Sequence, residues 1–393
     1  MKVLILSFYY APDLSAGSFR MTALVKSLVE VMPAGSTVDV VTTLPNRYHL
    51  FDVEAPAFER SGEVTIQRVA LPRHRSGMRD QSLAFAAFAR GATAITRGEK
   101  YDVVLATSSR LMTAVLGAWV AARVGAPLYL DIRDIFVETI HDIAPRSVGW
   151  AATLLFGWAE RWAVGCAQRV NLVSPGFAPY FENRYPNRAF KYFINGIDDQ
   201  FLCSPATAPK VEAVVGRVTV LYAGNLGEGQ GLHGILPALA LRGQGRLHFR
   251  VIGDGGRREA LVEALLRVGV TNVELVPPLS RERLIEAYRE ADVLFLHLND
   301  HEAVKRVLPS KIFEYAATGK PILAGVAGFA ASFISREVTN AAIFRPCDAG
   351  DAIRALDSLA LADSPRLEFR RRYSREQISR DMASDVVAVG QRG

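Results

Sequence analysis

The sequence has few of the features that mark disulfide-bonded, zinc-binding or membrane-spanning proteins. Its three cysteines, Cys166, Cys203 and Cys347, lie far apart. This spacing excludes a disulfide framework and the usual kind of zinc site, so a reducing, cytoplasmic setting is the simplest explanation. The longest apolar stretch, from Val148 to Phe156 and on to Trp158, is broken by charge and too short to cross a bilayer.

A signal peptide and a dinucleotide fingerprint are also missing. The apolar run that opens the chain ends at Ser7 and is soon followed by Pro12 and Asp13, which favours a first buried strand over a secretion signal. Gly17 follows that strand in a loop before a helical pattern, without the full G-x-G-x-x-G spacing. A dehydrogenase therefore gains little support, and Gly17 is read either as a plain turn or as a loop close to a ligand.

The composition is that of a globular protein with two domains. The chain has 393 residues, half of them hydrophobic and 22% charged, and its net charge is +6. Such a length is too great for one core. The net positive charge is compatible with binding to nucleic acid, to an anionic membrane surface or to phosphorylated substrates, and does not distinguish between them. Two prolines among small residues at 203–209 predict a linker between the domains.

Strand and helix patterns alternate on both sides of this linker. This alternation predicts an α/β protein in which each half is a parallel sheet covered by helices on both faces. Strands are expected at 2–7, 37–42, 63–69, 102–106, 127–130, 169–173, 192–193, 218–222, 248–252, 273–276, 292–297, 321–325 and 342–344. We expect domains at 1–199 and 200–365, a returning helical segment at 366–393, and a ligand in the crevice between the halves.

The stretch from Arg306 to Pro321 predicts a short helix with a polar side. Ser310 is placed to cap it, and Gly319 to end it. Lys311 and Glu314 project to one side with Ser310, so the helix N-terminus and a lysine attract an anion while a carboxylate accepts ribose hydroxyls. This set suits a nucleotide diphosphate. A plain surface helix with a serine cap is the alternative.

Two glycine-rich turns follow strands of the second half. The first contains four glycines between Gly224 and Gly231, together with Asn225 and Gln230, and its amides are suited to cradle phosphate. The second contains Asp254 and Gly255. In an open α/β sheet the carboxyl ends of the strands are where ligands bind.

Charged residues also follow a strand of the first half. Asp131, Arg133 and Asp134 stand where an apolar strand ends, an arrangement that is costly unless the groups face a cleft or pair with one another. An internal ion pair between Arg133 and one aspartate is the structural alternative. A basic loop at 73–79 is read as solvated, with contact to an acidic acceptor or to lipid headgroups as the weaker hypothesis.

Together these motifs carry a resemblance to the family-4 retaining glycosyltransferases of GT-B fold, over essentially the whole chain. The most specific stretches surround Asn225 and Glu314. The sequence is most similar to bacterial transferases of N-acetylfucosamine and related amino sugars in O-antigen and capsule synthesis. The motifs are Pro12 to Gly17, Asn195-Gly-Ile-Asp198, Ala223-Gly-Asn to Gln230-Gly231, Gly253-Asp-Gly-Gly256 and Ser310-Lys-Ile-Phe-Glu314 to Pro321.

The resemblance implies two Rossmann-like domains facing across a cleft, with a nucleotide sugar bound mainly by the second and an acceptor by the first. By position, Glu314 holds the ribose, Ser310 and Lys311 lie by the diphosphate, and the Leu279 backbone meets the base. Asp254, Gly255 and Gly256 line the pocket, and Gly17 approaches the phosphates. Asp131, Arg133 and Asp134 fall where the family has acceptor-side or sugar-contacting groups. No cofactor and no metal are implied.

Three positions depart from the family pattern. The wider family often carries Glu where this chain has Arg306, and Arg and Lys where it has Asn225 and Gln230. Two expected phosphate-binding cations are therefore missing. Lys311 is the hypothesised replacement, with Arg306 or Lys305 as further candidates, because a leaving diphosphate needs charge neutralisation most in the transition state.

The sequence thus predicts a hexosyltransferase-type enzyme that uses a UDP-sugar and a polyprenyl-diphosphate-linked sugar acceptor. It is expected in the cytoplasm, on the inner face of the membrane, with no nucleic-acid partner. The alternatives are a nucleotide-sugar epimerase of the same fold, which needs no acceptor, and a catalytically silent nucleotide-sugar-binding protein.

Overall fold

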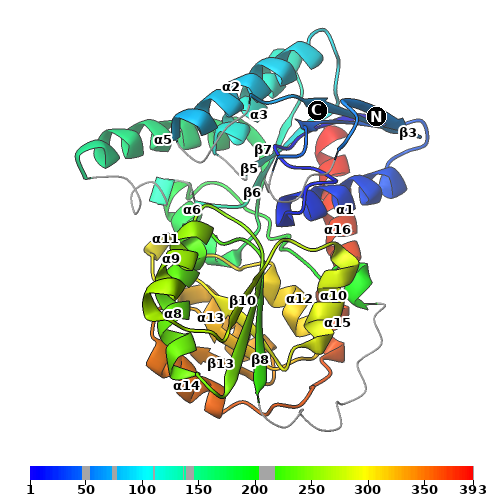
Figure 1. Cartoon of the computed structure of the whole chain (residues 1–393). Coiled ribbons are helices and arrows are strands. Elements are labelled where there is room, and N and C mark those ends of the chain that lie inside the picture. Colours follow the sequence, from blue (N-terminus) through cyan, green and yellow to red (C-terminus); the bar gives the residue numbers. More distant parts are fainter. Residues whose placement is uncertain are drawn as a thin grey trace. The chain divides into compact units, whose positions relative to one another are not determined.

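The structure is a computed structural model that describes residues 1–46, 54–72, 78–108, 111–135, 137–138, 146–202 and 217–392, without the side chains of 78–79 and 146–152. The described chain divides into two compact units (Figure 1). The first unit contains the described residues up to Asn195 together with those from Arg375 onward, and the second runs from Gly196 to Ser374. The predicted basic loop at 73–79 and the predicted linker at 203–209 lie outside the fully described residues.

The first unit is built on a seven-stranded sheet in the order β3-β4-β2-β1-β5-β6-β7. All neighbouring strands are parallel except β3, which runs antiparallel to β4. Val3 pairs with Val38 on one side and Val103 on the other, so the apolar run of β1 lies at the centre of the sheet. The strands are β1 Lys2–Leu6, β2 Thr37–Thr43, β3 Phe58–Ser61, β4 Val64–Val69, β5 Val103–Ser108, β6 Leu128–Ile132 and β7 Ala167–Leu172.

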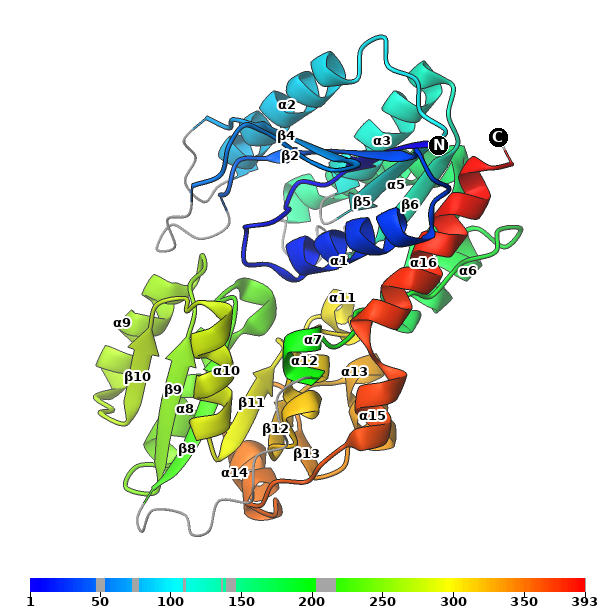
Figure 2. The same cartoon turned by 90° about the vertical axis from the view of Figure 1, so that its right-hand side faces the viewer.

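Helices cover both faces of this sheet (Figure 2). On one face α1 (Ala16–Val31) and α16 (Arg375–Gly390) pack side by side, and Met21 and Met382 share one core with Val3. On the other face lie α2 (Met78–Ile95), α3 (Leu111–Val124) and α5 (Arg146–Cys166), followed by η1 (Pro175–Phe177) and α6 (Ala178–Arg184). Among the described helices, none has the length and hydropathy needed to cross a membrane.

The second unit is built on a six-stranded parallel sheet in the order β10-β9-β8-β11-β12-β13. Its core lies between the sheet and α8, α9 and α14, and α10 and α12 contact the sheet from the other face (Figure 1). The strands are β8 Val218–Ala223, β9 Leu247–Ile252, β10 Val273–Val276, β11 Val293–His297, β12 Ile322–Gly325 and β13 Ala341–Phe344. The helices are α7 Asp199–Leu202, η2 Glu228–Gln230, α8 Leu232–Arg242, α9 Arg258–Val268, α10 Arg281–Glu290, α11 Glu302–Lys305, α12 Lys311–Thr318, α13 Gly328–Glu337, α14 Ala349–Asp357 and α15 Leu367–Arg372.

The predicted α/β class with two parallel sheets is confirmed, with three local differences. Strand β3 was not predicted, and 192–193 forms no strand but follows an isolated bridge at Lys191. The final helical segment is two helices that belong to different units. The first of them, α15, stays with the second unit because Phe369 packs among Phe313, Phe333 and Tyr373 at centroid distances of 4.6–6.3 Å.

Candidate functional site

Lys311, the first residue of α12, lies against the end of β8. Its Nζ donates a 2.9 Å hydrogen bond to the Tyr222 hydroxyl and lies 4.4 Å from the centre of that ring. The Tyr222 hydroxyl in turn donates to the Asn225 carbonyl at 2.6 Å. A Cβ at Gly224, where φ is +139°, would lie 2.2 Å from Lys311 Cε, so only glycine leaves room for the lysine. The structure therefore brings Lys311 together with the first glycine-rich turn.

The environment of Lys311 lowers the proton affinity of its amine. Burial lowers the pKa of its ammonium to about 8, and the carboxylate of Glu314 acts in the opposite direction. An anion arriving beside Nζ would favour the charged form. Lys311 is therefore a buried amine whose charged form an anion would stabilise.

Glu314 lies one turn further along α12 and is 8% exposed. Its Oε1 accepts a 3.0 Å hydrogen bond from Arg281 Nη1, and its Oε2 accepts one of 3.3 Å from the Tyr288 hydroxyl. A carboxylate has about four acceptor positions, so two partners leave capacity for a diol. The predicted carboxylate is present, but it is held by two side chains of α10.

Arg281, Tyr288 and Asp198 were not identified from the sequence. Arg281 also donates through Nη2 to Asp198, and its guanidinium lies 4.6 Å from the centre of the Phe201 ring. Asp198 was quoted only as part of a motif, and it is separated from Arg281 by 83 positions. No local pattern in the sequence connects residues this far apart.

The start of α12 differs from the prediction at Ser310. The helix begins at Lys311 and ends at Gly319, whose φ of +82° matches the expected glycine cap. Ser310 is the N-cap residue, yet its backbone is helical (φ −58°, ψ −27°) and its side chain accepts no hydrogen bond from the helix. The first turn of α12 therefore has no cap from the Ser310 hydroxyl, which corrects the expected serine cap.

Asn225 and Gln230, which stand where the family has cations, bind each other. Asn225 Nδ2 donates to Gln230 Oε1 at 2.8 Å, and Gly227 N donates to the same oxygen at 3.3 Å. Gly231 then caps α8. The two amides thus shape the turn between β8 and α8 without adding charge.

His297, at the end of β11, forms a hydrogen bond with this turn. Its Nδ1 lies 2.6 Å from the Gln230 carbonyl, and its Nε2 accepts a 3.0 Å hydrogen bond from Cys347 N. Nδ1 therefore carries the proton and donates it to Gln230. Burial lowers the pKa of His297 to about 4, so the ring is neutral at physiological pH.

The remaining predicted residues of the second unit lie at the ends of neighbouring elements. Asp254 Oδ1 accepts a 2.8 Å hydrogen bond from Gly255 N, and a Cβ at Gly255 (φ +154°) would lie 2.7 Å from the Leu226 carbonyl oxygen. Leu279 is half-buried between β10 and α10. Arg306 follows α11 and is half-buried.

Lys305, a further candidate cation, forms ion pairs at the surface of the second unit. Its Nζ lies 2.6 Å from Glu302 Oε1 and 3.3 Å from Asp300 Oδ1. Two carboxylates already neutralise this ammonium. Lys311 is therefore the stronger candidate to replace the missing charges.

Asp131, in the first unit, is fully buried at the end of β6. Its two oxygens accept hydrogen bonds from Arg20 Nε and Nη2, Asn171 Nδ2 and Thr107 Oγ1 at 3.0, 2.9, 2.8 and 3.3 Å. These four bonds fill the acceptor positions of a carboxylate. The predicted contact of Asp131 with a ligand is thus corrected, and its ion pair is with Arg20 rather than Arg133.

Arg133 and Gly17 lie side by side in the first unit. A Cβ at Gly17 would lie 3.4 Å from Arg133 Nη1, so the guanidinium faces the first turn of α1. Nε and Nη1 of Arg133 are buried and have no hydrogen-bond partner among the described residues. Burial lowers the pKa of Arg133. Asp134, the next residue, is exposed.

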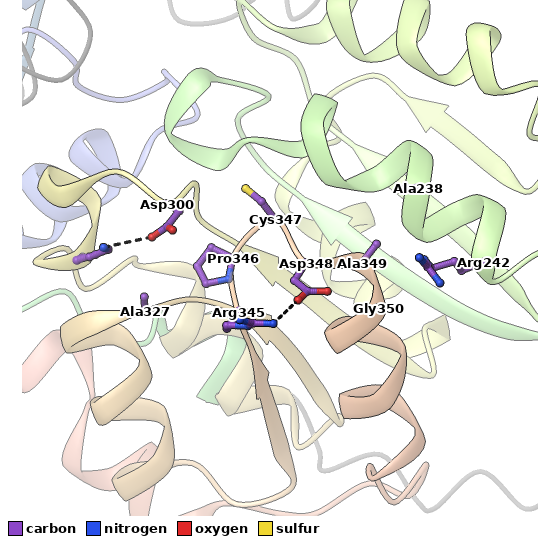
Figure 3. A pocket seen from close by; sticks show the side chains of 11 residues that line it. Ala238, Arg242, Asp300, Ala327, Arg345, Pro346, Cys347, Asp348, Ala349 and Gly350 are labelled. Atoms are coloured by element: carbon purple, nitrogen blue, oxygen red, sulfur yellow. Dashed lines mark hydrogen bonds and ion pairs between the residues drawn. The ribbon is translucent and has the colours of Figure 1, made fainter.

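An open pocket of about 690 Å³ lies elsewhere in the second unit (Figure 3). Its wall carries the ion pairs Lys305–Asp300 at 3.3 Å and Arg345–Asp348 at 2.7 Å. Lys305, the weaker candidate cation, lies in its wall, but Lys311, Glu314 and the glycine-rich turns are not among the described residues that line it. The pocket is therefore separate from the Lys311 and Glu314 site.

Two family models match separate parts of the chain. Residues 205–379 match the family described as "Glycosyl transferases group 1", and residues 20–191 match the "Glycosyl transferase 4-like domain". A putative colanic acid biosynthesis glycosyl transferase, WcaI of Escherichia coli K12, is 31% identical over 100 residues, which is 25% of this chain and 24% of that protein. The matched stretch thus spans about a quarter of the relative.

Solved structures share the fold over the full length. Sucrose-phosphate synthase from Thermosynechococcus elongatus superposes with a TM-score of 0.65 at 17% identity, covering 100% of this chain and 96% of that one. Anabaena Alr3699/HepE in complex with UDP and glucose gives a TM-score of 0.59 at 18% identity, covering 100% and 98%. At these identities the likeness concerns the fold.

Proposed function

With a group 1 domain in its C-terminal half and a 4-like domain in its N-terminal half, this chain is a glycosyltransferase of GT-B fold, and we propose that its donor is a UDP-sugar bound at Lys311 and Glu314. The observation that carries this proposal is the position of Lys311 against Tyr222 and Gly224, one helical turn from the carboxylate of Glu314. A diphosphate beside the ammonium would leave the ribose of the same nucleotide near the carboxylate.

The proposed chemistry needs little from the protein beyond charge and orientation. The nucleotide diphosphate leaves the anomeric carbon, the acceptor hydroxyl attacks from the same face, and an oxygen of the leaving phosphate takes its proton. The sugar is transferred with retention of configuration, and no protein nucleophile is involved. Lys311 contributes most as negative charge develops on the leaving group.

The proposed acceptor is a polyprenyl-diphosphate-linked saccharide, and the product a bacterial surface polysaccharide. The similarity to WcaI, which is named for colanic acid biosynthesis, supports this class of pathway. An N-acetylated amino sugar is the proposed donor sugar, on the resemblance to the amino-sugar transferases. In the first unit, the buried and unpartnered nitrogens of Arg133 are suited to an anionic group of such an acceptor.

A lipid-linked acceptor requires contact with a membrane, and α5 offers a surface for it. Leu154, Leu155 and Trp158 on this helix are 57%, 63% and 67% exposed, and Arg161 is exposed one turn later. Exposed leucine and tryptophan next to a basic residue are typical of helices that rest on an anionic lipid surface. We therefore propose a peripheral enzyme at the inner face of the cytoplasmic membrane.

The test is sugar transfer by the purified protein, measured with a panel of UDP-, GDP- and dTDP-sugars and a membrane extract as the acceptor source. Transfer from a UDP-sugar is expected, with kcat lowered about 10²–10³-fold in Lys311→Ala. The matched control is Arg267→Ala, an exposed cation on α9 of the same unit. Turnover of Lys311→Ala at the wild-type rate would refute the role of Lys311, and a product formed without acceptor would identify an epimerase.

A further inference from the structure

Arg281 stands between two carboxylates that come from different elements of the second unit. Nη1 donates to Glu314 on α12 at 3.0 Å, and Nη2 donates to Asp198, which immediately precedes α7. The Arg281 side chain is 12% exposed, and those of Glu314 and Asp198 are 10% and 19% exposed. The three groups thus form a largely buried row, in which the arginine is shared.

The other surroundings of Arg281 restrict its movement. The guanidinium lies 4.6 Å from the centre of the Phe201 ring, and Phe201 stacks on Tyr288 at 5.8 Å. Tyr288 donates to the second oxygen of Glu314 at 3.3 Å. Burial disfavours the charged form, yet the carboxylates of Glu314 and Asp198 hold the pKa of Arg281 above its ordinary value. A planar guanidinium held in this way fixes the direction of the carboxylate that it binds.

We propose that Arg281 is a positioning residue for pentose recognition, which orients the Glu314 carboxylate so that its remaining acceptor positions meet the 2′- and 3′-hydroxyl groups of a nucleotide ribose. The inference rests on the proposed function, in which Glu314 holds the donor nucleotide. Asp198 helps to hold Arg281 in this orientation, because it accepts a hydrogen bond from Nη2 of the guanidinium while Glu314 accepts one from Nη1. Loss of Arg281 then weakens recognition of the diol and leaves the contacts of the base and the diphosphate in place.

The experiment compares the dissociation constants of UDP and 2′,3′-dideoxy-UDP by isothermal titration calorimetry. For the wild type the dideoxy analogue is expected to bind at least about 100-fold more weakly, because it lacks two hydrogen bonds to a charged group. In Arg281→Met this ratio should fall below about threefold, through weaker binding of UDP and unchanged binding of the analogue. Arg281→Lys, which keeps the charge without the planar fork, should give an intermediate ratio.

Controls separate the possible failures. Arg250→Met removes an arginine that pairs with Glu290 at 2.9 Å at the surface of the same unit, and should keep the wild-type ratio. Suppose that Glu314→Gln no longer distinguishes UDP from the dideoxy analogue, but Arg281→Met or Arg281→Lys keeps the wild-type ratio of dissociation constants. The inference about Arg281 is then overturned, and the proposed function stands. Should Arg281→Met not fold, Arg281→Lys decides. The proposed function is overturned as well if the wild type binds none of UDP, GDP and ADP. It is also overturned if Glu314→Gln still distinguishes UDP from the dideoxy analogue as strongly as the wild type does.

Discussion

Arg20 on α1 binds Asp131 at the end of β6 through two hydrogen bonds, Nε to Oδ2 at 3.0 Å and Nη2 to Oδ1 at 2.9 Å. Arg20 also donates to the carbonyls of Phe193 at 2.7 Å and Ile194 at 2.9 Å. Burial opposes ionisation of Asp131, but Arg20 holds the pKa of that carboxyl below its ordinary value. The pair therefore joins the helix, the strand and the segment that leads to Asn195, where the chain passes to the second unit.

We predict that Asp131→Ala destabilises the first unit, because it leaves the buried Arg20 cation without its partner. Removing one member of a buried ion pair costs about 3–5 kcal/mol, a fall of roughly 10 °C in the melting temperature of a unit of this size. Differential scanning calorimetry measures it. Asp381→Ala, which removes an exposed carboxylate on α16, is the control. Unchanged melting of Asp131→Ala with lost turnover would instead return Asp131 to the catalytic groups.

The pH dependence of nucleotide binding should follow the protonation of the Lys311 side chain. Its pKa in the free protein is about 8, so the ammonium is present below pH 8 and is lost as the pH rises through that value. UDP favours the protonated form, and its affinity should be constant below pH 8 and fall by up to tenfold per pH unit above it. Calorimetry between pH 6.5 and 9.5 gives this profile. Lys311→Arg stays charged and should bind with a flat profile, whereas a wild-type affinity that does not change above pH 8 would contradict the assignment.

The lowered pKa of His297 predicts that the second unit becomes less stable at acidic pH. Its folded pKa of about 4 lies below the ordinary value of 6.5, so between these pH values the unfolded chain binds more protons than the folded one. The contribution of His297 to stability is complete above pH 6.5 and is lost as the pH falls toward 4, with a total of roughly 3 kcal/mol. Denaturant unfolding of wild type and His297→Asn at pH 7 and pH 4.5 measures it. A stability difference between the two proteins that is the same at both pH values would be inconsistent with a neutral, buried His297.

The exposed face of α5 should be required for membrane binding. In Leu155→Ser/Trp158→Ser the partition onto phosphatidylethanolamine/phosphatidylglycerol vesicles should fall at least tenfold, since each apolar side chain gains about 1.5–3 kcal/mol on leaving water. Vesicle co-sedimentation measures the partition. Leu266→Ser on α9 removes a leucine that is 75% exposed in the second unit and should bind like the wild type. Equal binding of all three proteins would exclude α5 as the contact.

The architecture and part of the site were predictable from local patterns. The apolar run of β1 and the helical spacing from Met21 onward identified the central strand and its helix, and Gly319 identified the end of α12. Lys311 and Glu314 were found because helix spacing alone places them near one another. Short-range signals of this kind suffice wherever an element is decided by its own residues.

The partners of these residues were not predictable, because they depend on packing between distant segments. Nothing near Asp131 in the sequence indicates Arg20, which is 111 positions away, whereas Arg133 is only two positions away. Arg281 reads as an ordinary first-turn residue of α10 until Asp198 and Glu314 are placed on either side of it. Ser310 has the residue type of a cap but adopts helical angles, so residue type alone did not determine its role.

The most direct test of the account is a crystal structure of the protein with UDP bound. The diphosphate is expected within hydrogen-bond distance of Lys311 Nζ, and both ribose hydroxyls on the Glu314 carboxylate, which stays bound to Arg281. Nucleotide density away from Lys311 and Glu314 would contradict the central claim.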